Sequence, residues 1–273
     1  MTSCSSLARG LAEPLAGSAP TTAAWLALEQ PGAWGARAPG DSNLAPDVAR
    51  DLDARTAGLP IRVVLIRRPG RHPDVGPTGP RTLLVARPGP EPELRRITLP
   101  DPRALLDLDL TSILASGPLP GPPDDATVVL VCTNGRRDVC CARNGREAVE
   151  RLIRDDRLEV WESTHLGGHR FSPTVLQLPD GWLFGGPEAA SLSTAACRGR
   201  TDLTAGAQAA ELAVLAHRGV SMPRPLTTAA LPDGAFLVDG VAVRVDERAV
   251  GADRPHSCGG LLRPTTAPLA HLI

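Results

Sequence analysis

Short apolar runs and stretches with helical spacing alternate along the first half of this chain. The segments IRVVLIRR (61–68), RTLLVARP (81–88) and ELRRITLP (93–100) predict three strands. PDVARDLDARTAG (46–58) has apolar residues at helical spacing and predicts a helix. We therefore expect the N-terminal part to be mixed α and β.

A second series of elements begins at ATVVLVCTNG (126–135), a continuous apolar run typical of a strand covered on both faces. A helix is predicted over 144–156 and a strand over 158–164. The turn residues within 174–186 predict a hairpin, and 201–219 has the spacing of a helix that ends at a glycine. This part is expected to follow the order β-α-β-β-α.

A Pro- and Gly-rich segment, ASGPLPGPPDDA (115–126), separates the two series. Such a segment neither continues a helix nor pairs in a sheet, so it indicates a domain boundary. The fold class is α/β, and we predict three parts: a mixed N-terminal domain over 1–120, a second domain over 121–225, and a C-terminal hairpin and tail over 226–273. The last twenty residues show no clear period.

Composition narrows the range of partners. A formal net charge of −1, with no dense arginine block carrying interleaved aromatics, argues against a nucleic-acid partner. No run approaches the roughly 18 to 20 apolar residues that cross a bilayer. Residues 1–25 lack the apolar core of a secretory signal. We expect a cytoplasmic protein with no membrane association.

Candidate ligands for a metal follow two neighbouring predicted strands. Cys132 ends the first strand, and eight residues separate it from Cys141. His165 and His169 flank a Gly-Gly pair that lets the backbone fold closely. Two thiolates and two imidazoles suit tetrahedral zinc, and equally a [2Fe–2S] cluster in which histidine replaces cysteine on one iron. Their spacing leaves both possibilities open.

Several of these segments resemble a known family. VCTNGRRDVCCARNG (131–145), HLGGHRFSP (165–173) and PDGWLFGG (179–186) are similar to the sucrase/ferredoxin-like proteins, which are thioredoxin-like ferredoxins with bis-histidinyl [2Fe–2S] clusters. WLALEQPGAWG (25–35) and LIRRPGR (65–71) look like the N-terminal half of bacterial members. The resemblance spans most of the chain and implies a thioredoxin-like ferredoxin domain over 121–225.

The resemblance also implies a ligand set. Cys132 and Cys141 would bind one iron, and His165 and His169 the other; Cys140, adjacent to Cys141, is the alternative in that register. Neutral imidazoles remove negative charge from the cluster and raise its potential, and their second ring N–H can couple electron uptake to proton uptake. The function implied is one-electron transfer or redox sensing, with an unidentified redox protein as donor or acceptor.

Two other readings of the same residues stay open. A structural zinc site accepts the same Cys2His2 set, and a thiol–disulfide oxidoreductase is compatible with cysteines after the first strand of such a domain. No pair of carboxylates is placed for glycoside hydrolysis, so we expect an electron carrier rather than an enzyme with its own substrate. The remaining cysteines, Cys4, Cys197 and Cys258, are interpreted as structural residues.

Overall fold

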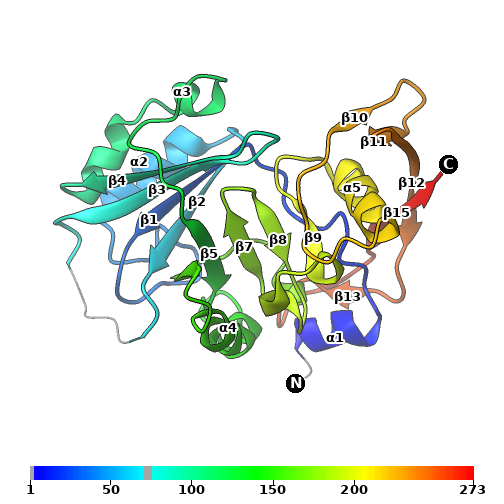
Figure 1. The fold of residues 1–273 in the computed structure, drawn as a ribbon. Helices are drawn as coiled ribbons and strands as arrows, with labels where there is room; N and C mark the ends of the chain where they lie inside the picture. Colours follow the sequence, from blue (N-terminus) through cyan, green and yellow to red (C-terminus); the bar gives the residue numbers. More distant parts are fainter. Residues whose placement is uncertain (1–2, 71–75) are drawn as a thin grey trace.

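The computed structural model describes residues 3–70 and 76–273, so Arg71, the last residue of the segment 65–71, lies outside the described part. A nine-stranded mixed sheet runs through the molecule in the order β4-β3-β1-β2-β6-β5-β7-β8-β9 (Figure 1). The strands are β1 (Ala24–Glu29), β2 (Ile61–Arg67), β3 (Arg81–Arg87), β4 (Glu93–Leu99), β5 (Thr127–Cys132), β6 (Leu158–Ser163), β7 (Val175–Leu178), β8 (Trp182–Phe184) and β9 (Cys197–Arg200). The predicted α/β fold class is confirmed.

The two halves of this sheet repeat one topology. In each half the first two strands are parallel and a helix joins them: α2 (Pro46–Thr56) joins β1 to β2, and α4 (Val139–Leu152) joins β5 to β6. The third strand of each half pairs antiparallel with the first, and the fourth with the third. We call the strands β1–β4 the first unit and β5–β8 the second unit. Their spatial orders, β2-β1-β3-β4 and β6-β5-β7-β8, correspond strand for strand.

The two units join where β2 pairs antiparallel with β6, a contact that we call the seam. Its register has two residue pairs, Ile66 with Ser163 and Arg67 with Glu162. The guanidinium of Arg67 lies 2.7 Å from a carboxylate oxygen of Glu162, and both side chains are largely buried. The sheet is thus continuous across the two units, and the division into parts at 1–120, 121–225 and 226–273 stays a prediction.

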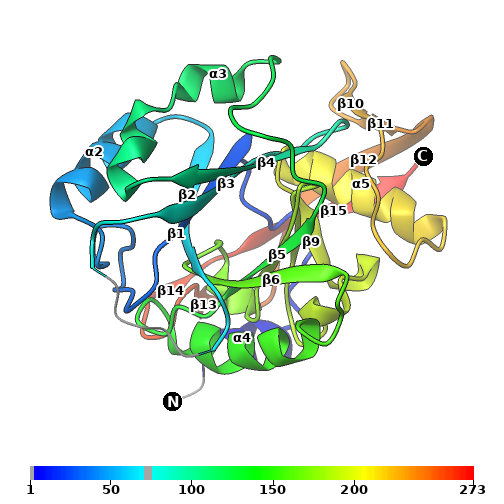
Figure 2. The same ribbon diagram turned by 60° about the vertical axis from the view of Figure 1, so that its left-hand side comes forward.

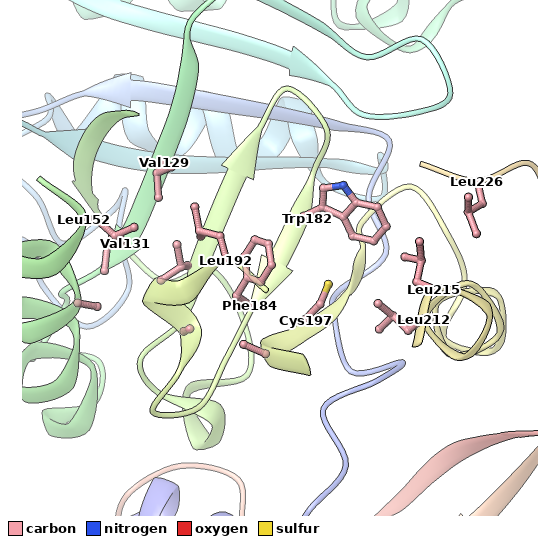
Figure 3. Close-up of a cluster of buried hydrophobic side chains, with 14 of the residues drawn as sticks. Val129, Val131, Leu152, Trp182, Phe184, Leu192, Cys197, Leu212, Leu215 and Leu226 are labelled. Atoms are coloured by element: carbon pink, nitrogen blue, oxygen red, sulfur yellow. The ribbon is translucent and has the colours of Figure 1, made fainter. Parts of the chain in front are cut away.

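Apolar side chains cover both faces of the sheet. On the face covered by α5 (Ala205–His217), Leu212 and Leu215 pack against Trp182 and Cys197 of the sheet (Figure 3). Helix α4 packs on β5 and β6 (Figure 2). Val128 to Cys132 are completely buried, as expected for a central strand.

The C-terminal residues form a second sheet in the order β10-β11-β12-β15. Its strands are β10 (Thr228–Ala230), β11 (Phe236–Val238), β12 (Val241–Ala249) and β15 (Thr266–Leu272), and a two-stranded pair is formed by β13 (Arg254–Pro255) and β14 (Leu262–Arg263). The tail without a sequence period therefore contains a strand, because pairing with β12 supplies the order that periodicity does not show.

The remaining helices are short. They are α1 (Cys4–Gly10), α3 (Leu110–Leu114) and the 3-10 turns η1 (Pro102–Asp107), η2 (His169–Phe171), η3 (Ala189–Ser191) and η4 (Thr194–Ala196). In the part of the chain that the structure describes, no helix has the length and apolar character needed to span a bilayer.

Candidate metal centre

Both predicted cysteine ligands lie where β5 meets α4. Cys132 is the last residue of β5, and Cys141 lies in the first turn of α4. The helix begins at Val139 rather than at Asn144, so the predicted start was wrong. Valine and cysteine have modest helix propensity, so the first turn of the helix could not be recognised from the sequence pattern. A Cβ on Gly145 would lie 2.2 Å from the carbonyl oxygen of Cys132, so this glycine lets α4 approach the end of β5 closely.

The thiols of Cys132 and Cys141 form a buried pair. Neither side chain has measurable exposure. A hydrogen bond from the Cys141 thiol holds the pKa of Cys132 well below its usual range, and the same interaction raises the pKa of Cys141. One sulfur of the pair therefore carries negative charge readily, which is the state that binds a metal.

His165 and His169 form a second pair in the segment after β6. Their ring centroids are 4.8 Å apart, and the rings are tilted by 42°. Gly168, between them, has a left-handed φ of +68°, and a Cβ there would lie 2.3 Å from the Arg198 guanidinium. Burial, followed by the nearby His165, lowers the pKa of His169. This favours the neutral imidazole that ligates metals.

The two pairs meet at Cys132, whose low pKa is also supported by a hydrogen bond from His165. Cys132 thus interacts with both Cys141 and His165, and the ring of His165 lies beside that of His169; we call these four residues the Cys2His2 site. The Nδ1 atoms of both histidines are buried without a hydrogen-bond partner among the described residues. An unpaired buried nitrogen is costly, and a bound metal would satisfy it. The donors therefore fit a metal centre.

Cys140 lies in a different group. Its Sγ is 3.6 Å from that of Cys4 and 3.0 Å from Oδ1 of Asp138, and the thiol of Cys258 lies 3.6 Å from that of Cys4. We call Cys4, Asp138, Cys140 and Cys258 the thiol cluster. This cluster was not predicted from the sequence, because its contacting cysteines are up to 254 residues apart in the chain. No local motif joins such positions.

Asp138 lies between the two groups. Its Oδ2 is 3.7 Å from Nε2 of His169 and accepts a hydrogen bond of 3.0 Å from the backbone N–H of Cys258. A carboxylate beside the outer nitrogen of a ligating histidine commonly orients that ring. Asp138 was also missed as a functional candidate, although it lies inside the segment 131–145 that carries the cysteines.

The segment that follows β1 contacts the loop after Cys132. The side-chain amide of Asn134 donates to the carbonyl of Gly35 at 3.0 Å, and Arg67 donates to that of Gly32 at 2.7 Å. Arg67 also stacks on Trp34, with its guanidinium carbon 4.0 Å from the ring centroid. The segment after β1 therefore supports the loop that follows Cys132.

Exposed side chains lie close to the buried donors in the sequence. Arg136 and Arg137 are exposed, and so is Val139, with 71% of its surface accessible. Arg170, directly after His169, instead pairs with Glu13 at 2.7 Å. The surface beside the site is thus basic with one apolar residue.

Comparison with known proteins gives one match. No curated protein and no solved structure matches the chain. A model of the family described as Sucrase/ferredoxin-like matches residues 15–190, a range that holds both units of the large sheet, the whole Cys2His2 site and Asp138, but neither Cys4 nor Cys258. Because this match covers more than half of the chain, the chain belongs to the sucrase/ferredoxin-like family.

Proposed function

We propose that this protein binds a [2Fe–2S] cluster and works as a one-electron carrier or redox sensor. Cys132 and Cys141 would bind one iron, and His165 and His169 the other. One observation carries the proposal: two imidazoles whose buried Nδ1 atoms are unpaired lie beside a buried thiol pair. These are the donors that a cluster with histidine on one iron requires.

The arrangement favours two irons over one zinc ion. The donors divide into a thiol pair and an imidazole pair, as expected when each pair binds a separate iron. A single tetrahedral ion holds all four donors within about 4 Å of one another. Among the described residues, the donors that lie within 4.8 Å of one another are those of the thiol cluster, and the four of the Cys2His2 site do not form such a group.

Burial argues against thiol–disulfide exchange. A substrate disulfide must reach a sulfur atom, and catalytic cysteines of that class are partly exposed. Cys132 and Cys141 have no measurable exposure. The order β6-β5-β7-β8, with α4 between its two parallel strands, supports the thioredoxin-like domain that the resemblance implies, here used as a frame for a cofactor.

A bound cluster would supply reversible one-electron chemistry. The protein residues set its charge and its access to solvent. Neutral His165 and His169 contribute no negative charge, which favours acceptance of an electron. Asp138 lies near Nε2 of His169 and would favour a proton on that atom, so His169 could take up a proton when a bound cluster is reduced. His165 is only half-buried, and the electron would leave on its side.

The surface beside the site fits a protein partner of opposite charge. Arg136 and Arg137 would attract an acidic redox protein, and Val139 would add apolar contact. The cytoplasmic location stays a prediction.

The experiment that tests this proposal measures iron, acid-labile sulfide and zinc in protein purified without oxygen, together with visible spectra before and after dithionite. We expect two irons and two sulfides per chain, with absorption that bleaches on reduction. Cys132→Ser should abolish both, and Cys197→Ala, at a buried cysteine of β9, should preserve both. Colourless protein with one zinc that depends on Cys132 would contradict the proposal.

A further inference from the structure

We propose that the thiol cluster is a second metal site, that it takes zinc, and that it binds zinc whether or not the Cys2His2 site holds iron. Its four ligand atoms come from Cys4, Asp138, Cys140 and Cys258, and all of them lie within 4.8 Å of one another. Three thiolates and a carboxylate are ligands that zinc accepts.

The spacing of the sulfur atoms is that of ligands sharing one ion. A tetrahedral zinc with Zn–S bonds of about 2.3 Å places its sulfurs about 3.8 Å apart. The Cys4 sulfur lies 3.6 Å from the sulfurs of both Cys140 and Cys258. A disulfide would require about 2.05 Å. Both Asp138 oxygens lie 3.9 Å from the Cys4 sulfur, so the carboxylate can supply the fourth ligand.

Burial of the acidic and thiol groups of the cluster favours a bound cation. Cys4, Asp138 and Cys140 are 1%, 3% and 4% exposed. Among the described residues, the side chain within ion-pair distance of the Asp138 carboxylate is that of His169, at 3.7 Å. A buried carboxylate among three thiols is costly without a positive partner. Zinc would provide that charge and convert the thiols to bound thiolates.

The cluster joins segments from opposite ends of the chain. Cys4 begins α1, Cys258 follows β13, and both meet Cys140 in the first turn of α4. Helix α1 packs against β13 and against η2, which begins at His169 (Figure 1). Because all four ligands come from the protein, such a zinc would be structural, and it would hold both terminal segments over the Cys2His2 site.

A second contact holds the same segments without metal. The carboxylate of Glu13 pairs with Arg170 of η2 at 2.7 Å and with Arg254 of β13 at 2.8 Å. The side chains of Glu13 and Arg254 are 2% and 1% exposed, and that of Arg170 is 18% exposed. The terminal segments are therefore positioned before metal binds, and the ligands of the thiol cluster are brought together in advance.

The test loads anaerobically purified, reduced protein with Zn²⁺ alone, removes unbound metal by gel filtration, and measures zinc and iron. Wild-type protein should retain one zinc per chain at this site. The variant Cys4→Ser/Cys258→Ser should lose it while its iron content stays that of the wild type, and Cys197→Ala should retain it. In a Cys132→Ser/His165→Ala variant, the zinc should remain although iron is lost.

A measurement on wild-type protein covers the case in which the double variant does not fold. Alkylation of Cys258 by iodoacetamide, followed by mass spectrometry, should be rapid in zinc-free protein and strongly slowed after loading with Zn²⁺. Equal alkylation rates, zinc retained by Cys4→Ser/Cys258→Ser, or a disulfide among these three cysteines in the reduced preparation would overturn the proposal. Iron content reports separately on the Cys2His2 site, so the two proposals can fail independently.

Discussion

The Cys2His2 site and the thiol cluster each contain one of two adjacent cysteines of the same helix. Cys140 and Cys141 follow each other in α4, and successive helical side chains point about 100° apart, so they join different groups. The Cys2His2 site takes all its ligands from the second unit. The thiol cluster takes two from that unit, Cys140 in α4 and Asp138 directly before it, and two from distant segments of the chain. A site whose ligands all come from one supersecondary unit can be recognised from a sequence motif. A site whose ligands come from segments far apart in the chain cannot.

The largest expected effect comes from removing each of these two cysteines in turn. Cys141→Ala should abolish iron binding, because it removes one of two thiolates from an iron. Cys140→Ala should keep iron and its visible spectrum but lose the zinc of the thiol cluster. Metal analysis of both variants, purified in parallel, provides the measurement. If Cys140→Ala lost iron and Cys141→Ala kept it, Cys140 would be the iron ligand, and the assignment of the two cysteines to separate groups would be wrong.

A smaller effect is expected from the contact that links them. Glu13→Gln leaves the buried Arg254 and Arg170 without their carboxylate, and breaking such a pair costs about 3 kcal/mol of unfolding free energy. Urea denaturation of metal-free protein measures this cost. The exposed pair of Glu147 with Arg151 is the matched control, and Glu147→Gln should change stability by less than about 0.5 kcal/mol. Equal losses in both variants would show that Glu13 does not anchor the terminal segments.

The smallest expected effect is a change in reduction potential when one proposed ligand, His165, is replaced. His165→Cys should retain a cluster, and its reduction potential should fall by on the order of 100 mV or more, because a thiolate adds negative charge. Spectroelectrochemistry measures the potential, with the Cys4→Ser/Cys258→Ser variant as a control that should stay near the wild-type value. A potential that does not move in His165→Cys would remove His165 from the ligand set.

All strands of the two units except β1 could be predicted from the sequence. Their patterning is local, and segments such as 61–68 and 81–88 end within one residue of β2 and β3. The start of α4 was placed too late because its first turn, with Cys140 and Cys141, has modest helix propensity and is held against β5 by Gly145.

Features that depend on pairing across the chain were not predictable in the same way. Strand β15 exists because it pairs with β12, and its own residues show no strand period. The four candidate ligands of the Cys2His2 site could be named in advance because each follows a strand of one unit. Cys4 and Cys258 could not, since their proximity arises from tertiary packing of α1 and β13.

The seam has a consequence for how the molecule unfolds. The strand pairing at the seam is limited to two residue pairs, and the Arg67–Glu162 ion pair, the pairs of Arg68 and Arg96 with Glu159 and a shared apolar cluster add to it. The hydroxyl of Thr133, next to Cys132, donates to the same Glu162 carboxylate at 3.1 Å. Local openings in proteins involve contiguous cooperative units, which often coincide with supersecondary motifs such as these two. If the first unit opened, Glu162 would lose Arg67, and the loop beside Cys132 would lose its support. Cluster retention would then report the folding of strands that contribute no ligand to it.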